Sequence, residues 1–462
     1  MSASLASLNR NELCAWGAWG FPDEAKKRFV PVQNGYGSYT PREGIVNWNR
    51  PRDIDVLYIY PKDLTMIEEK FGSWMVQYGY CNYCPADRVA NLGKIENGKL
   101  HLGLCNYSTV VVGFEPIYNE DFLNLLEKFA NEGGNVIWNS TPPADKNGVI
   151  PTSWLELFGI DKATVVSDGA SARSVSFIGD LEGIADMNIN TAYLPDRTYK
   201  IEISGASSPV AYADGALIGC TRAYGHGKVT YIGCRLRDDQ SGESGDAPST
   251  LFDVLKTLGA YGGKDCYDNP ETISRKSEYF ASRFPNGTYS LCRHYRTMRE
   301  LWPEGIFMRH KDVDAKFLEG YDMLVPTELD FSDFSIDGHK ISYTGRGFVQ
   351  FRLDSCGNLC GFRGDNTQGI TIDGKEYNVT EENANTAFGL LEDCRIPDGY
   401  KMGFMISSNA PVVDICTHIP ENAEIYAAPH ATGFELIEDA SLYFEGSKVF
   451  IGNTRTVVIL VK

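Results

Sequence analysis

The spacing of apolar residues changes near residue 262, and this change constrains the fold more than any other feature of the sequence. Before it, apolar runs alternate with helical stripes, and after it, short alternating segments are separated by turn dipeptides such as Asn286-Gly287 and Asp373-Gly374. The 462 residues also exceed the length at which a single hydrophobic core keeps growing. We therefore predict an α/β domain at residues 51–262 and a β-sandwich at residues 263–462.

Two strand–helix units open the predicted α/β domain. Ile54–Tyr60 and Thr109–Phe114 are nearly continuous apolar runs, as expected for strands that are covered on both faces. The first run precedes a capping box formed by Thr65 and Glu68, and the second precedes the helix-capping residue Asn119. This spacing predicts a parallel sheet with right-handed crossovers.

Further strands follow in both predicted domains. In the α/β domain they are expected at Asn135–Trp138, Ser174–Ile178, Pro209–Ala213, Ala216–Cys220 and Lys228–Ile232, and a helix capped by Ser249 closes the domain. In the antiparallel β-sandwich they are expected at Tyr289–Tyr295, Phe348–Leu353, Lys401–Ile406, Val412–Thr417, Lys448–Ile451 and Thr456–Val461. Residues 1–50 do not have the pattern of a domain and are interpreted as an N-terminal arm.

Charge and composition exclude several function classes. The net charge is −18 without a basic stripe, which disfavours binding to nucleic acid or to an anionic membrane surface. No apolar run approaches the ~20 residues that a membrane span needs, and the first residues lack the pattern of a signal peptide. We therefore expect a cytoplasmic protein.

The cysteine pattern is that of reduced, buried thiols rather than of a metal site. The pairs Cys81–Cys84 and Cys356–Cys360 lie in different predicted domains, and no histidine stands near either pair. Asp354 and Asp365 fall in turn-rich loops that would suit calcium, but they lack regular ligand spacing. No glycine-rich nucleotide motif is present, so we expect no cofactor.

Two stretches carry a resemblance to a known family. The segments VVVGFEP…FLNLLEKFANEGGNVIWNSTPP and SSPVAYADGALIGCTRAYGHGKVTYIG resemble the β-galactosidase trimerisation domain of glycoside hydrolase family 42. The resemblance implies an amidotransferase-like (flavodoxin-like) α/β fold without amidotransferase chemistry, followed by a β-domain. In that family the domain follows a catalytic barrel, and residues 1–50 would correspond to the exit of that barrel.

The resemblance implies a protein of carbohydrate metabolism without its own catalytic barrel. Fifty residues cannot form eight βα units, so the two catalytic carboxylates of the family have no counterpart here. Whether the chain is an enzyme stays open, because a β-galactosidase-like activity would depend on a barrel from elsewhere. The expected role is oligomerisation, with a homotrimer as one form, or sugar binding, with a barrel partner and a carbohydrate ligand.

Six residues are candidates for sugar binding. Glu115 and Trp138 follow or end buried strands of the α/β domain, where open sheets bind ligands. His226 stands on a tight turn. For these three the alternatives are a loop carboxylate, a core tryptophan and a solvated histidine. The remaining candidates are the arm residues Trp16, Trp19 and Trp48, whose rings would either stack on sugars or anchor the arm by packing.

Two other functions remain open. An active amidotransferase needs a nucleophile on a sharp strand-to-helix turn, but the strand at Asn135–Trp138 continues as Asn139-Ser140-Thr141-Pro142-Pro143 without a cysteine. An amidotransferase-like hydrolase would therefore use an unrecognised nucleophile. The third hypothesis is a carbohydrate- or protein-binding module whose function lies in the sandwich loops.

Overall fold

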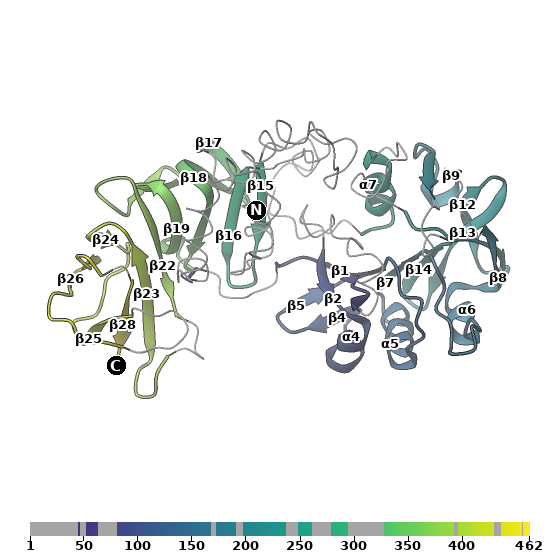
Figure 1. The fold of residues 1–462 in the computed structure, drawn as a ribbon, viewed down its shortest axis with the longest axis horizontal. Coiled ribbons are helices and arrows are strands. Elements are labelled where there is room, and N and C mark those ends of the chain that lie inside the picture. Colours follow the sequence, from purple (N-terminus) through teal and green to yellow (C-terminus); the bar gives the residue numbers. More distant parts are fainter. Residues whose placement is uncertain are drawn as a thin grey trace, which may run out of the picture. The chain divides into compact units, whose positions relative to one another are not determined.

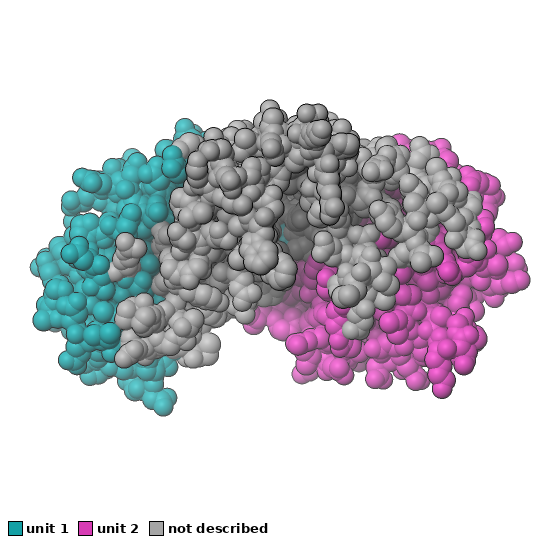
Figure 2. Space-filling model, viewed as in Figure 1, with its two compact units in different colours: residues 1–53, 265–302, 306–462 teal, residues 54–264, 303–305 magenta. Residues whose placement is uncertain are grey.

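The computed structural model of the protein has two compact units, which are coloured separately in Figure 2. Both units consist mainly of β structure. The described residues are 45–46, 52–62, 81–167, 172–190, 197–236, 248–260, 279–293, 328–391, 396–428, 436–454 and 456–462. One unit comprises residues 54–264 and 303–305, and the other comprises residues 1–53, 265–302 and 306–462. We call them the α/β unit and the β unit. Within the described ranges no helix is both long and apolar enough to cross a membrane.

The α/β unit is built on a nine-stranded mixed sheet with the order β10-β9-β12-β13-β14-β7-β6-β1-β2. Its strands are β1 (Val56–Ile59), β2 (Asn82–Cys84), β6 (Thr109–Val112), β7 (Asn135–Asn139), β9 (Ala172–Phe177), β10 (Met187–Asn190), β12 (Ser208–Ala213), β13 (Ala216–Tyr224) and β14 (Gly227–Ile232). From β2 to β14 neighbouring strands run parallel, and from β14 to β10 they run antiparallel. The parallel part confirms the prediction made from the strand–helix spacing.

Helices cover both faces of this sheet (Figure 1). They are α4 (Ala86–Leu92), α5 (Glu120–Asn131), α6 (Thr152–Phe158) and α7 (Pro248–Thr257). The first three lie on one face and α7 on the other. Asn119 caps α5 as predicted, since its side-chain oxygen accepts the Phe122 N–H at 3.0 Å. The Asn135 side chain donates to the Leu258 carbonyl at 2.7 Å, which ties the end of α7 to the start of β7.

Several local predictions differ from the structure. Helix α7 begins at Pro248, before the predicted cap Ser249, because the fixed φ of proline suits the first helical turn. A small sheet of β3 (Lys94–Glu96), β4 (Lys99–Leu102) and β5 (Cys105–Tyr107), and a ribbon of β8 (Ile160–Ser167) and β11 (Thr198–Ile203), were not anticipated. The capping box at Thr65 and Glu68 lies outside the described residues.

The β unit is built on an eleven-stranded sheet whose main path is β15-β16-β18-β19-β22-β23-β28-β25. These strands are β15 (Tyr279–Arg283), β16 (Thr288–Arg293), β18 (His339–Leu353), β19 (Leu359–Thr367), β22 (Ala384–Leu390), β23 (Met402–Ser408), β25 (Ala423–Ala427) and β28 (Thr456–Val461). Off this path lie β17 (Glu328–Ile336), β20 (Gly369–Ile372) and β21 (Lys375–Asn378), and a separate sheet contains β24 (Val412–Asp414), β26 (Tyr443–Glu445) and β27 (Lys448–Phe450). The pairings among the described strands of the unit are all antiparallel, as predicted.

Two of the predicted turn dipeptides form two-residue hairpin turns. Asp373 and Gly374 join β20 to β21 with φ values of 51° and 77°. Asp337 and Gly338 join β17 to β18 with φ values of 52° and 84°. A two-residue turn of this kind requires positive φ at both positions, which explains the preference for aspartate followed by glycine.

The main sheet of the β unit has two different faces. One face carries the large apolar core, with residues such as Leu291, Phe351 and Phe388 buried against the smaller sheets. The other face carries a small apolar cluster that includes Ile45. The adjacent Val46 carbonyl accepts hydrogen bonds from the Asn286 side chain and the Thr288 hydroxyl. The described end of the arm therefore packs on the β unit.

Candidate functional site

The carboxyl ends of the five parallel strands define the candidate site in the α/β unit. In chain order these strands are arranged 2-1-3-4-5, that is β2-β1-β6-β7-β14. The order reverses between β1 and β6, and open α/β sheets bind ligands outside the carboxyl ends of their strands at such a reversal. We call this rim the carboxyl edge.

Tyrosine rings gather at the carboxyl edge beside β1. Tyr60 stacks on Tyr83 with ring centroids 5.1 Å apart, and Tyr58 lies 5.7 Å from the same ring. Gly113, just after β6, makes room for Tyr58, because a Cβ atom there would lie 1.5 Å from the tyrosine hydroxyl oxygen. The half-buried Glu115 follows two residues later and thus belongs to this edge, as its place after β6 indicated.

Ser140 occupies the position after β7 where a nucleophile would stand. Its φ is 76°, in the left-handed region that residues other than glycine seldom adopt. Its N–H points to the carbonyls of Ile232 and Cys234, at 2.8 and 3.1 Å, and its carbonyl accepts the Tyr231 hydroxyl at 3.0 Å. The side chain is fully buried, and among the described residues neither Ser140 Oγ nor Asn139 Oδ1 has a hydrogen-bond partner.

The chain after Ser140 does not continue as a helix. Ala144 instead pairs with Ile117 in an isolated bridge, and Asp145 closes a turn by accepting the N–H groups of Asn147 and Val149. The next helix, α6, begins twelve residues after Ser140, at Thr152. A nucleophile elbow is a strand-to-helix turn, so only its strained residue is present here.

Two thiols on strands of the sheet are poor nucleophiles. Burial raises the pKa of the Cys84 thiol, at the end of β2, to about 11. Burial likewise raises the pKa of Cys220, on β13, to about 12. The thiolate is the reactive form, so at neutral pH these two cysteines are protonated and inert.

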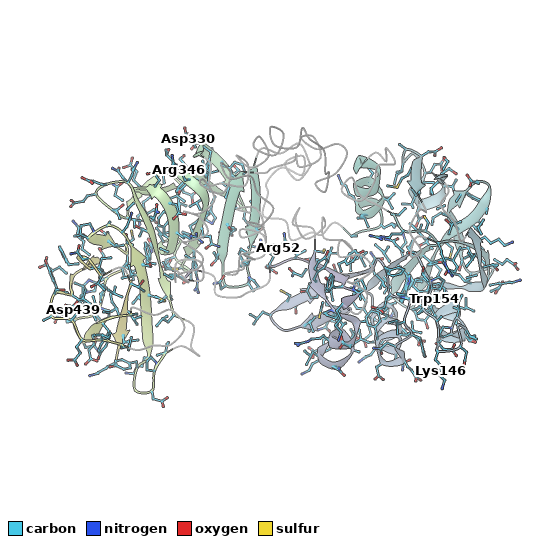
Figure 3. All side chains as sticks on the ribbon, viewed as in Figure 1. Arg52, Lys146, Trp154, Asp330, Arg346 and Asp439 are labelled. Atoms are coloured by element: carbon cyan, nitrogen blue, oxygen red, sulfur yellow. The ribbon has the colours of Figure 1, made fainter. Side chains whose placement is uncertain are left out.

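Trp138 lies in the core of the α/β unit and not in a crevice. Its side chain is 2% exposed, and its indole N–H donates to the Thr141 carbonyl at 3.1 Å. Its ring meets the edge of Trp154 at 5.7 Å between centroids, and Trp154, on α6, is labelled in Figure 3. Trp138 therefore has the place of a core tryptophan, and its buried ring offers no face to a sugar.

His226 and Glu115 do not share a site. His226 is exposed on the turn before β14, where its backbone N–H donates to the Asn131 carbonyl at 3.0 Å. Glu115 follows the carboxyl end of β6, and β6, β7 and β14 run parallel. The two residues therefore lie at opposite ends of the sheet. The arm candidates Trp16, Trp19 and Trp48 lie outside the described residues.

The two aspartates suggested for calcium serve other contacts. Asp354 Oδ1 accepts the N–H groups of Cys356 and Asn358, both at 2.8 Å, and these hydrogen bonds hold the pKa of Asp354 below its usual value. Asp365 lies 3.7 Å from the Arg363 guanidinium. No group of three or more metal-binding side chains occurs within the described part of the chain.

A feature of the β unit was missed at the sequence level. Ser282, Ser290, Gln350 and Arg363 are buried polar residues that stand directly opposite one another on four neighbouring strands. The available signal was a polar residue between apolar ones, as in Tyr289-Ser290-Leu291. Such alternation normally indicates a solvent-facing position, so the sequence alone did not distinguish a buried polar face from an exposed one.

Comparisons with known proteins give partial structural matches. No family model and no curated protein matches the chain. A β-galactosidase from Rahnella sp. R3 is 12% identical over 53% of this chain and 36% of its own, with a TM-score of 0.38. A β-galactosidase from Halorubrum lacusprofundi is 14% identical over 56% of this chain and 37% of its own, with a TM-score of 0.36.

A third match is a whole small protein. A cytoplasmic protein from Salmonella typhimurium is 11% identical over 44% of this chain and 98% of its own, with a TM-score of 0.30. The chain spans little more than a third of the length of the two β-galactosidases. At these identities and TM-scores, the matches carry no argument for a shared activity.

Proposed function

We propose that this chain is a glycoside-hydrolase-associated protein of carbohydrate metabolism that lacks a catalytic barrel and acts in oligomerisation or sugar binding. One observation carries the proposal: the sheet has the parallel core of a ligand-binding α/β fold, yet the strand that should feed a catalytic elbow ends in Asn139-Ser140-Thr141-Pro142-Pro143 with no helix behind it. Two prolines in this stretch disfavour such a helix.

The strand order supports an amidotransferase-like (flavodoxin-like) α/β unit within this proposal. The order 2-1-3-4-5 of the parallel strands is that of flavodoxin-like sheets. The segments that resemble the family 42 trimerisation domain include β6, α5 and β7, and, further along, β12, β13 and β14. Both arguments favour a scaffold whose chemistry, if any, comes from another domain.

The proposed partners follow from the same scaffold. We propose a cytoplasmic homo-oligomer, a trimer being one form, that binds a catalytic barrel through its arm. The contacts of Ile45 and Val46 with the β unit support an arm that is anchored at its end. Upstream of this anchor, Trp16 and Trp19 would then contact the barrel or a sugar.

Two measurements on the full chain test this function. The purified protein should not hydrolyse nitrophenyl β-galactoside or nitrophenyl β-glucoside, and light scattering after size-exclusion chromatography should give a mass above that of one chain. Robust hydrolysis by the pure chain would contradict the absence of a catalytic site. A strictly monomeric mass at micromolar concentration would remove oligomerisation and leave sugar binding as the role to test.

A hydrolase that uses Ser140 is the second candidate, because Ser140 has the strained backbone expected of an elbow residue. Its test is labelling with a fluorophosphonate probe. Labelling that is lost in Ser140→Ala, but kept in the control Ser207→Ala, would favour the hydrolase. Without labelling, the scaffold proposal stands, since the Ser140 hydroxyl is fully buried and none of the described histidines contacts it.

A further inference from the structure

The described end of the arm, Ile45–Val46, lies on the face of the main β-unit sheet that carries the small apolar cluster. Ile45 and Val46 are 5% and 3% exposed, and Ile45 packs in that cluster with Met405 and Val458. Met405 on β23 pairs with Val458 on β28, so the two side chains stand next to each other on the sheet. The end of the arm is therefore buried on a surface that the strands themselves form.

Two glycines make room for the arm at this place. Gly361 on β19 and Gly389 on β22 are neighbours, since the antiparallel pairing of these strands places them opposite each other. A Cβ atom on Gly389 would lie 2.8 Å from the Ile45 carbonyl oxygen, and its three nearest atoms would all belong to Ile45. A Cβ atom on Gly361 would lie 3.2 Å from Val46 Cγ1. We call this pair of glycines the glycine notch.

Backbone conformation does not explain the two glycines of the notch. Neither Gly361 nor Gly389 has a positive φ, so other residues could adopt the same conformation. Glycine inside a strand weakens the strand, and it often marks a place where another backbone approaches closely. At the glycine notch the approaching backbone is that of the arm.

Two side chains beside the notch bind the backbone of the arm. The Asn286 amide and the Thr288 hydroxyl both donate to the Val46 carbonyl, at 3.2 and 3.1 Å. Asn286 Oδ1 accepts the Thr288 N–H at 3.1 Å, which turns the amide nitrogen towards the arm. A strand added to a sheet is held by main-chain hydrogen bonds. The Val46 carbonyl is held by side chains instead, so this segment crosses the face of the sheet without extending it.

We propose that the glycine notch, together with Asn286 and Thr288, is a peptide-binding site whose ligand is the chain's own arm. The fitting peptide has two successive aliphatic residues, since Ile45 fills the apolar cluster and Val46 lies against a glycine. Ile45–Val46 is thus a latch that fixes where the arm leaves the β unit. A barrel bound through residues upstream of the latch would then be presented by the β unit, and only this consequence rests on the partner proposed above.

Thiol labelling of the full chain tests the latch. The substitution Val46→Cys puts a thiol at the buried position, and its alkylation by iodoacetamide is followed by peptide mass mapping. The exposed Cys356 and the buried Cys360 are internal references in the same chain. The introduced thiol should react at least about tenfold more slowly than Cys356, because alkylation requires it to leave the notch first.

Two further substitutions, each added to Val46→Cys, should open the latch from different sides. Gly389→Ala places a Cβ atom against Ile45. Asn286→Asp replaces the amide that donates to the Val46 carbonyl by an oxygen that cannot donate. Each should raise the alkylation rate of the introduced thiol at least about tenfold. The control Gly205→Ala, where a Cβ atom would meet nothing within 4 Å, should leave the rate unchanged.

Two results would overturn the proposal. One is fast alkylation of the introduced thiol in a chain that is otherwise wild type, and the other is a rate that either Gly389→Ala or Asn286→Asp leaves unchanged. Protection of the buried Cys360 on β19 reports that the sheet beneath the arm is folded. If Gly389→Ala exposes Cys360 as well, Asn286→Asp decides alone, because it adds no bulk.

Failure of the latch and failure of the proposed function are distinguishable. A chain whose arm is not latched could still form oligomers or bind sugar, so the scaffold function would stand. Hydrolysis of a nitrophenyl glycoside by the pure chain would refute the scaffold function and would leave the latch untouched.

Discussion

Two buried serines in the main sheet of the β unit allow a matched experiment. It measures how much a hydrogen-bond partner contributes to the free energy of unfolding. Ser290 and Ser408 are 0% and 4% exposed, but among the residues that the structure describes only Ser408 Oγ has a hydrogen-bond partner. Its Oγ lies 2.7 Å from Thr386 Oγ1 and accepts the Ala410 N–H at 3.0 Å. Replacing each serine by alanine removes the same single oxygen from the two sites.

The two substitutions should have different effects on the free energy of unfolding. Ser290→Ala removes a hydroxyl whose burial without a partner costs about 1–3 kcal/mol, so it should leave stability unchanged or raise it by up to that amount. Ser408→Ala loses two hydrogen bonds of about 0.5–1.5 kcal/mol each and should lower stability by about 1–3 kcal/mol. A difference of at least about 1 kcal/mol between the variants is expected.

Urea denaturation followed by far-ultraviolet circular dichroism measures this difference. The slope of the free energy of unfolding against urea concentration should be the same in all variants, so that a change in the urea midpoint reports a change in stability alone. The two units can unfold in separate transitions. The comparison between variants therefore uses only the transition whose midpoint shifts in Ser408→Ala, which is that of the β unit. A loss of stability in Ser290→Ala as large as in Ser408→Ala would show that Ser290 Oγ has a partner in the folded protein, and this reasoning would fail.

Three further predictions concern local features. Asn119→Ala removes the N-cap of α5 and should lower stability by about 1 kcal/mol, measured by thermal unfolding. Gly113→Ala places a Cβ against the Tyr58 hydroxyl and should cost about 1–3 kcal/mol, whereas Gly205→Ala, with no atom nearby, should be almost neutral; equal effects would argue against the close approach. Hydrogen bonds from Lys462, Tyr400 and Tyr426 lower the pKa of Glu424 from 4.5 to about 2. The stabilising effect of the ionised Glu424 is therefore complete above pH 4.5 and is lost as the pH falls towards 2. In Glu424→Gln the thermal unfolding midpoint should therefore depend less on pH between 4.5 and 2 than it does in the wild type.

Local patterns in the sequence predicted local structure well. The Asn119 cap, the buried runs that became β1 and β6, and the hairpin turn at Asp373-Gly374 each depend on residues that are close in the chain. Capping, strand period and turn geometry act over a few residues, so their signals survive in the sequence. Even the error at Ser249 was a displacement of the cap by two residues at the start of the right helix.

Which residues meet was decided by the tertiary structure. The sequence by itself indicated parallel strands followed by antiparallel ones, the absence of a cysteine at the elbow, and the position of Glu115 after a strand. Only the strand order placed His226 at the opposite end of the sheet, and only the packing of α6 enclosed Trp138. The alignment of buried polar residues across the main sheet of the β unit likewise depends on the pairing of Ser290 with Gln350, sixty residues apart in the chain. Register between distant strands sets such contacts, and the pattern within one strand carries no record of its partner.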